Sequence, residues 1–417
     1  MNKRVLLIAY HYPPVSQSSG VHRTHKFAQY LPEFGWDPLV LSCNLRAYER
    51  YNEKNPADLP GVVVRRAFAL DTAKHLAIKG RYPRFLAMPD RWASWWFGAV
   101  PAGLSMIRRY RPQLIWSTYP IATAQLIGLT LHKLTGIPWV ADFRDPMTDD
   151  SYPRDPGVRK FYSKIERSTV RNASRMVFTT EDTLQKYVQR FPLADKKLFS
   201  VIANGYDEDD FSLAEQSIVH TAEPHSGPFV LIHSGLLYPS ERNPEPFFLA
   251  LSELRRDGHI SPDRLRIVLR ASGNETNYEK RLKELNIADI AFLEPSTPYV
   301  EALREMLTAD GLLVFQAANC NHQIPAKAYE YLRARRPVFA LTDHCGNTAQ
   351  LLRDSGIDTI VNIASKDEIK TGLVKFLQLL EFGNAPVAST QAVESHSRRA
   401  RTQALGQLFD NLLATGS

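Results

Sequence analysis

The chain has 417 residues, of which 44% are hydrophobic and 23% charged, with a net charge of +7 and a pI near 9.2. This composition excludes a disordered chain, and the length predicts two domains. The positive charge favours anionic ligands or an anionic membrane surface and does not point to nucleic acid. Three cysteines without metal or redox spacing predict a cytoplasmic protein, and no apolar run reaches the roughly 18–20 residues of a membrane span.

The chain opens with a βαβ pattern. An apolar run at 4–10 predicts a buried strand, a polar loop follows at 11–20, and a helix is expected from Val21, before a second strand at 39–42. The loop ends at Gly20 and lacks Gly-x-Gly-x-x-Gly, so a dinucleotide site is not predicted. Three side chains at the helix start are either acceptor contacts or solvated helix positions: His22, Arg23 and His25.

The segment 74–111 is rich in cations and aromatic residues. It holds eight Lys or Arg residues against one acid, and a further basic stripe follows on a predicted helix at 160–171. Basic and aromatic residues together suit a peripheral contact with an anionic membrane. The alternative is that the tryptophans pack into the core and the charges are ordinary surface. The side chains concerned are Trp92, Trp95, Trp96, Lys160, Lys164, Arg167 and Arg171.

Further apolar runs predict a strand followed by a loop at 114–121, a strand followed by a polar loop at 138–146, and a strand at 176–180. A polar loop after the second of these carries Asp142, Arg144 and Asp145. Loops at the carboxyl ends of parallel strands line the ligand crevice, so these side chains are expected to face a cleft. An internal Asp–Arg pair that shapes the loop is the alternative. The polar stretch 212–228 predicts a linker.

The second half repeats the pattern. A strand at 229–235 ends in Ser-Gly, a loop at 236–244 contains Arg242, and a helix is expected from Glu245. A helix at 394–413 is predicted to end the chain. Four more strands are expected at 265–269, 291–294, 311–315 and 338–341.

The segment 324–341 predicts a short helix between two prolines and a buried strand after it. Lys327 lies in the first helical turn, where the helix dipole disfavours a cation by about 0.3–1 kcal/mol. A bound anion would remove that conflict. Glu330 lies at i+3 and can face the same side. The alternative is an amphipathic helix on which both charges are solvated.

Several of these motifs resemble glycosyltransferase family 4. Pro325, Lys327, Glu330 and Tyr331 fit the donor-binding helix of a subgroup of that family. Family resemblance also covers Asp-Phe-Arg-Asp-Pro at 142–146, Asn-Gly-Tyr-Asp at 204–207 and the Ser-Gly loop at 234–235. The chain departs from the usual family pattern at four places: His322 stands for a second Glu, Pro325 for a Gly, Leu236 for an Arg, and Ser18-Ser19-Gly20 for a glycine pair.

The resemblance implies an α/β protein of the GT-B fold with two facing Rossmann-like domains. The acceptor-side domain is expected at 1–212, the nucleotide-sugar domain at 213–385, and a helix crossing back to the first domain at 386–417. The implied reaction is retaining transfer of a sugar from a nucleoside-diphosphate sugar to a hydroxyl of a saccharide or lipid-linked acceptor, in polysaccharide or glycolipid biosynthesis. The resemblance implies no metal ion or other cofactor.

Within this frame Glu330 is expected to hold the donor ribose. Backbone N–H groups of the 234–235 loop and of the helix at 326 are expected to help neutralise the diphosphate. Two alternatives stay open: a non-catalytic saccharide-binding relative, and a sugar-nucleotide epimerase on the same fold. The expected catalytic residues are Arg242, Lys327 and Asp142, and the expected donor-binding residues are Glu330, Gly235, Gly20, His322 and Ala326.

Overall fold

The computed structural model describes residues 3–15, 19–49, 51, 59–149, 152–218 and 227–415. The chain forms two compact units, one of residues 1–204 with 398–417 and the other of residues 205–397. It therefore passes between the units after Asn204 and after Ser397, whereas the sequence placed the boundaries after residues 212 and 385. Residues 212–215 end a helix and are not linker. Ser18 and residues 219–226 lie outside the described residues.

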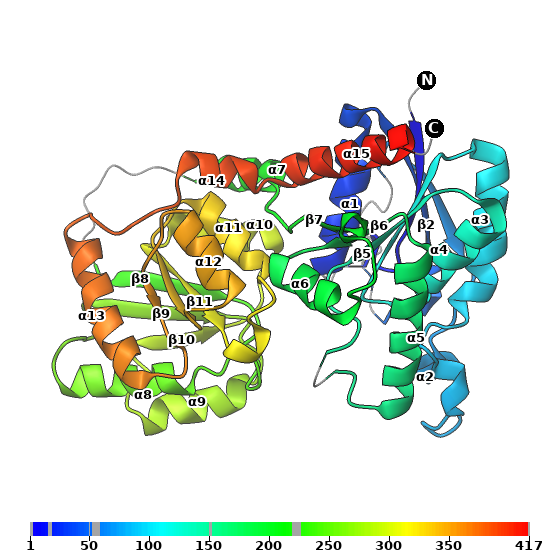
Figure 1. Cartoon of the computed structure of the whole chain (residues 1–417). Helices are drawn as coiled ribbons and strands as arrows, with labels where there is room; N and C mark the ends of the chain where they lie inside the picture. The colour runs from blue at the N-terminus through cyan, green and yellow to red at the C-terminus, as the bar shows by residue number, and fades with distance from the viewer. Residues whose placement is uncertain are drawn as a thin grey trace. The chain divides into compact units, whose positions relative to one another are not determined.

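The first unit is built on a parallel sheet of seven strands in the order β3-β2-β1-β4-β5-β6-β7 (Figure 1). The edge strand β3 was not predicted, because its sequence Val-Val-Arg-Arg-Ala is short and half polar. The strands are β1 (Lys3–Ile8), β2 (Trp36–Cys43), β3 (Val63–Ala67), β4 (Leu114–Thr118), β5 (Trp139–Phe143), β6 (Arg175–Phe178) and β7 (Phe199–Val201).

Helices cover both faces of this sheet. Because side chains alternate along a strand, Leu6 and Ile8 of β1 face α3 to α6, while Val5 and Leu7 face α1 and α15. Figure 1 shows the red α15 lying beside the blue α1, so the last helix packs on the first unit. The helices are α1 (Ser19–Tyr30), α2 (Thr72–His75), α3 (Trp95–Tyr110), α4 (Ala122–Thr135), α5 (Pro156–Asn172), α6 (Glu181–Arg190) and α15 (Arg398–Thr415).

The tryptophans of the 92–96 segment are core residues. Trp95 is fully buried, Trp92 donates from Nε1 to the carbonyl oxygen of Ala47 at 3.0 Å, and Trp96 donates from Nε1 to Oγ1 of Thr130 at 3.0 Å. Trp92 and Trp96 are partly buried and pack against the same core, so the structure supports the alternative of core packing for these tryptophans. In the described part of the chain no helix combines the length and the apolarity that spanning a membrane requires.

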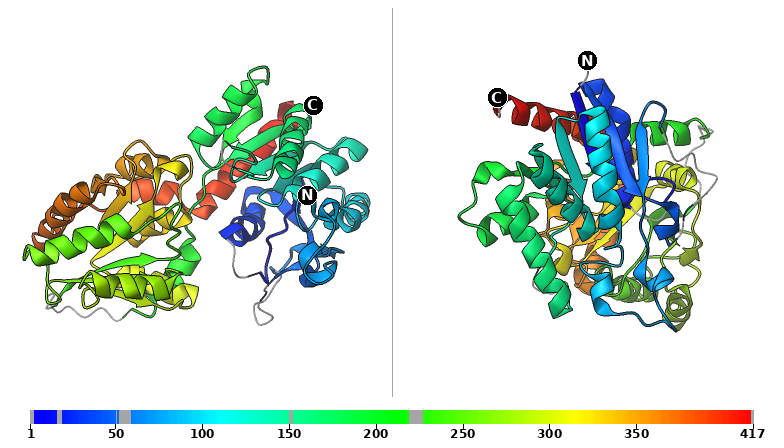
Figure 2. Two further views of the ribbon diagram at one scale, coloured as in Figure 1. Left: turned by 90° about the horizontal axis from the view of Figure 1, so that it is seen from below. Right: turned by 90° about the vertical axis from the view of Figure 1, so that its right-hand side faces the viewer.

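The second unit has a six-stranded parallel sheet in the order β10-β9-β8-β11-β12-β13. Figure 2 shows α8 and α13, in green and orange, side by side; they pack together over the core face of this sheet. Its strands are β8 (Phe229–Ser234), β9 (Leu265–Arg270), β10 (Ala291–Glu294), β11 (Gly311–Gln316), β12 (Val338–Thr342) and β13 (Ile360–Val361). Its helices are α7 (Glu208–Glu215), α8 (Glu245–Arg256), α9 (Glu275–Glu284), α10 (Tyr299–Thr308), α11 (Ala326–Ala334), α12 (Asn347–Asp354), α13 (Lys366–Glu381) and α14 (Thr390–Ser395).

Both sheets reverse their strand order at one point, between β1 and β4 in the first unit and between β8 and β11 in the second. In doubly wound sheets ligands bind beyond the carboxyl ends of the strands at this switch point. Gly235 directly follows β8, and the loop after β11 leads into α11. The fold thus brings the two segments singled out in the second half of the sequence to one edge of one sheet.

Candidate functional site

Gly235 and Lys327 are in direct contact at this edge. The backbone of Gly235 has φ +131, a conformation that only glycine adopts without strain. A methyl group placed on its Cα would lie 2.4 Å from both Cε and Nζ of Lys327. The glycine is therefore required twice, for its own backbone and for the path of the lysine side chain.

Lys327 is a half-buried cation in the first turn of α11. Burial lowers the pKa of its ammonium group, and the charge of Arg242 lowers it further, while Glu330 acts in the opposite direction. Among the described residues no carboxylate forms an ion pair with it. The conflict between cation and helix dipole that the sequence predicts is therefore not relieved by the protein itself.

Arg242 lies on the same side of the site. Its Nη1 donates to the carbonyl oxygen of Leu236 at 3.3 Å, and its Nε donates to Gln316 at 3.4 Å. These are long bonds to neutral acceptors, and no described carboxylate pairs with the guanidinium. Arg242 and Lys327 together line a cavity of about 10 Å³, room for about one water molecule. A larger ligand would have to lie against the cations from outside.

His233 and Tyr331 form the buried wall of that cavity. The Nδ1–H of His233 donates to the carbonyl oxygen of Leu313 at 2.8 Å, which leaves Nε2 as an acceptor, and Nε2 is buried without a partner. Burial lowers the pKa of His233 to about 3, so the ring is neutral at physiological pH. Sequence reasoning missed this histidine, although a polar residue inside the apolar run of β8 was a usable signal.

Glu330 follows Lys327 on α11 and is also nearly buried, at 8% exposure. Tyr299, at the start of α10, donates its hydroxyl proton to Oε1 of Glu330 at 2.9 Å. The second oxygen, Oε2, makes no hydrogen bond within the described residues. Tyr299 was not predicted, because it lies 31 residues away in the sequence and only the fold brings it to Glu330. The carboxylate is thus oriented by one protein donor and keeps one oxygen for another.

The backbone N–H groups of Ser234 and Gly235 are not available to neutralise a diphosphate, in contrast to the prediction. The N–H of Ser234 donates to the hydroxyl of Tyr331 at 3.2 Å, and that of Gly235 to the carbonyl oxygen of Arg270 at 2.8 Å. Both donors are satisfied inside the protein. The first N–H groups of α11, beginning at Ala326, lack intrahelical partners by their position and remain candidates for an anion.

One further expected donor contact, His322, lies away from this cavity. His322 is nearly buried, at 7% exposure, and does not line the cavity beside Lys327. No group of three or more His, Cys, Asp or Glu side chains in the described part of the chain is arranged to hold a metal ion. The expectation of a reaction without metal stays a prediction.

Asp142 is a buried structural residue, and its expected catalytic role requires correction. Its side chain is 0% exposed, and it accepts two hydrogen bonds from Arg23, at 2.7 and 3.1 Å, and one from Thr118 at 2.8 Å. The remaining N–H groups of Arg23 donate to residues 202–204. Asp142 therefore has no accessible oxygen for a substrate. Gly20, in the first turn of α1, is buried in the same unit.

Comparison with known proteins identifies a family for the first unit. Residues 19–205 match the family model described as "Glycosyl transferase 4-like domain". A sequence comparison with curated proteins finds no match.

Solved structures match over nearly the whole chain. Sucrose-phosphate synthase from Thermosynechococcus elongatus is 14% identical with a TM-score of 0.69, covering 99% of this chain and 100% of its own. HepE from Anabaena, solved in complex with UDP-glucose, is 13% identical with a TM-score of 0.64, covering 98% and 99%. WaaG, a glycosyltransferase involved in lipopolysaccharide biosynthesis, is 13% identical with a TM-score of 0.60, covering 97% and 99%.

Residues 19–205 form a glycosyl transferase 4-like domain, and the whole chain has the GT-B fold. The family model identifies the domain at 19–205, and the structural matches, at these low identities, establish the fold alone. The GT-B fold and the resemblance to glycosyltransferase family 4 that the sequence predicted are both confirmed. The matched domain lies in the first unit and supports a transferase, while the second unit places Lys327, Arg242 and Glu330 near one strand end.

Proposed function

We propose that this protein transfers a sugar from a nucleoside-diphosphate sugar to a hydroxyl acceptor, and that the second unit binds the donor. The observation that carries the proposal is Lys327, a half-buried cation held across Gly235 with no carboxylate partner among the described residues. Leaving a buried charge uncompensated is costly, so such a group usually has an anionic ligand. The complex of HepE with UDP-glucose supports a nucleotide sugar as that ligand.

The residues of the site suit the chemistry. In the transfer, the bond between the anomeric carbon and the diphosphate oxygen breaks, and its electron pair leaves with the diphosphate. The acceptor oxygen forms the new bond to carbon and loses its proton. Lys327, Arg242 and the first N–H groups of α11 would stabilise the charge that develops on the leaving diphosphate. Glu330 would accept a hydrogen bond from the ribose through Oε2.

Retention of configuration and independence of metal ions are part of the proposal, because they are implied by the family resemblance. A saccharide or a lipid-linked molecule is the acceptor we propose, in polysaccharide or glycolipid biosynthesis. His322 and Leu236 depart from the family pattern on the donor side, and they are the reason to test activity itself.

The decisive experiment measures nucleotide release from a panel of sugar donors, with saccharide and lipid-linked acceptors and without them. Release that depends on both donor and acceptor supports the transferase. Donor binding without turnover would favour a non-catalytic saccharide-binding protein. Conversion of the sugar nucleotide without any acceptor would favour the epimerase. A matched Lys327→Met variant should lose the turnover, because the proposed donor site would then lack its cation.

We also propose that the first unit docks, in the cytoplasm, on an anionic membrane surface, through exposed residues of the 74–111 segment and without its tryptophans. Ile78 and Phe85 are 79% and 73% exposed, and exposed cations lie near them in the sequence: Lys74, Lys79 and Arg81. Each cation near an anionic surface contributes about 1 kcal/mol. Arg84 and Arg91 do not belong to this set, because Arg84 pairs with Asp155 and Arg91 pairs with Asp71 and Glu49.

Sedimentation with anionic vesicles tests the docking. Binding should weaken steeply with salt, because exposed charges are screened within about 8–10 Å at physiological ionic strength. Ile78→Ser with Phe85→Ser should reduce binding, and Lys79→Glu with Arg81→Glu should abolish it at low salt. Binding that neither pair changes would rule this surface out.

A further inference from the structure

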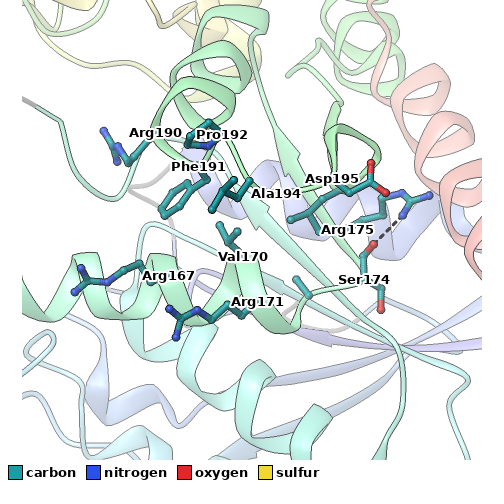
Figure 3. Close-up of a pocket in the computed structure, with 13 residues that line it drawn as sticks. Arg167, Val170, Arg171, Ser174, Arg175, Arg190, Phe191, Pro192, Ala194 and Asp195 are labelled. Atoms are coloured by element: carbon teal, nitrogen blue, oxygen red, sulfur yellow. Dashed lines mark hydrogen bonds between the residues drawn. The ribbon is translucent and has the colours of Figure 1, made fainter.

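A second pocket lies in the first unit, with a volume of about 730 Å³ (Figure 3). It is formed by the last turns of α5, the start of β6, the end of α6 at Arg190, and residues 191–195 and 198 after it. Volumes of about 300–1,000 Å³ are typical of small-molecule sites. Because ligands of doubly wound sheets bind at the carboxyl ends of the strands, this pocket lies at the opposite edge of the sheet from the expected crevice.

The floor of the pocket is apolar. Figure 3 shows Val170 from α5 together with Phe191 and Ala194 from the segment after α6 in the middle of the pocket. Leu198 adds to the floor, and Leu193 lines the pocket although its side chain is fully exposed. An isolated exposed leucine is ordinary, but here it extends an apolar surface that is already concave.

The rim of the pocket is strongly basic. Among the described lining residues Asp195 is the one acid. Four arginines line the pocket: Arg167, Arg171, Arg175 and Arg190. Arg190 is engaged by buried Glu166 at 3.1 Å. Arg167 and Arg171 are exposed on α5, and no described carboxylate pairs with either. In Figure 3 these two side chains lie at the edge of the pocket, below its apolar centre.

We propose that this pocket binds a lipid that carries a phosphate, with the hydrocarbon chain on the floor and the phosphate at Arg167 and Arg171. An uncharged apolar ligand would leave the cations unused, and a free anion would leave the apolar floor in water. Only a molecule with both parts matches both surfaces. A protein partner is less suited, because stable protein interfaces bury about 1,200–2,000 Å² and this site is a single concavity.

Calorimetric titration of the full chain with hexyl, octyl and decyl phosphate, each below its micelle concentration, tests the proposal. Affinity should rise with chain length, by up to about fourfold for each methylene that becomes buried. Inorganic phosphate and decyl maltoside should each bind at least about tenfold more weakly than decyl phosphate. Affinity that does not depend on chain length, or equal binding of decyl maltoside, would overturn it.

Paired variants locate the site. Arg167→Glu with Arg171→Glu should weaken decyl phosphate binding at least about tenfold, and Leu193→Asp should also weaken it. The matched control is Lys160→Glu with Lys164→Glu, an equal charge change at exposed positions of the same helix that do not line the pocket. An equal loss in the control pair would show general electrostatics and overturn the assignment. No nucleotide sugar is present, so the result is independent of the proposed reaction.

Discussion

Arg23 in the first unit is buried and Lys327 in the second is half-buried, and the two cations differ in what surrounds them. In the first unit all five N–H groups of Arg23 have acceptors, and the guanidinium pairs with Asp142 at 2.7 Å. In the second unit Lys327 has no described carboxylate partner. A saturated buried charge holds a fold together, whereas an unsaturated one at a strand end marks a place for a ligand.

The largest effect is expected from breaking the saturated pair. Arg23→Met leaves the Asp142 carboxylate buried without a partner, which should lower the free energy of unfolding by about 3–5 kcal/mol. All six tryptophans lie in the first unit, so urea unfolding followed by tryptophan fluorescence reports on that unit alone. Adding Asp142→Asn should recover part of the loss. An unchanged unfolding midpoint in Arg23→Met would show that the pair does not hold the unit together.

The second prediction concerns the contact between Gly235 and Lys327. Gly235→Ala should displace the lysine and weaken nucleoside-diphosphate binding about ten- to hundredfold, the value of a charge-assisted hydrogen bond of about 1.5–3 kcal/mol. Gly258→Ala is the matched control, since Gly258 also has a positive φ, +76, but nothing lies within 4 Å of the added methyl group. If both variants lose affinity equally, backbone strain explains the loss and Lys327 does not.

A smaller loss is expected at Glu330. Glu330→Gln keeps the shape of the side chain and removes its charge, so the dissociation constant of the nucleotide should rise about tenfold. A 2′,3′-dideoxy nucleotide should bind the wild-type protein as weakly as the normal nucleotide binds Glu330→Gln. Glu330→Gln should not weaken the binding of the dideoxy nucleotide any further. Unchanged nucleotide affinity in a folded Glu330→Gln protein would remove the ribose assignment.

The smallest effect is a pH dependence. Burial holds the pKa of Lys327 below its usual value, and a bound diphosphate favours the protonated form. Affinity for a nucleoside diphosphate should therefore fall as the pH rises from about 7 to about 10, while the diphosphate itself stays fully ionised. Lys327→Arg should bind with little change over that range, because arginine stays protonated. Titration calorimetry at several pH values measures both, and an identical pH profile for the two proteins would contradict the role of the lysine.

The sequence predicted local features well. Helix α11 spans Ala326–Ala334 as expected, because Pro325 and Pro337 bracket a run of good helix formers. Most buried strands were found for the same reason, since an apolar run with flanking turns is a local signal. The terminal helix was predicted as one element at 394–413, but the structure divides it into α14 and α15 at residues 396–397.

What the sequence could not show depends on contacts between distant residues. Arg23 and Asp142 are 119 positions apart, so their saturation could not be read from either motif. The N–H groups of the 234–235 loop were expected to be available, yet their acceptors come from β9 and α11. The tryptophans fitted two environments by spacing alone, and only packing against the sheet distinguished the core from a membrane contact.

The most direct test of the central claim compares nucleoside diphosphates with the matching nucleosides, titrated into the wild-type protein and into Lys327→Met with Arg242→Gln. If these two cations hold the diphosphate, at least one nucleoside diphosphate should bind the wild-type protein and lose about a hundredfold or more in the double variant, because each lost charge-assisted contact is worth about 1.5–3 kcal/mol. The nucleoside should bind both proteins equally. Equal losses for nucleoside and diphosphate, or none for either, would contradict the account.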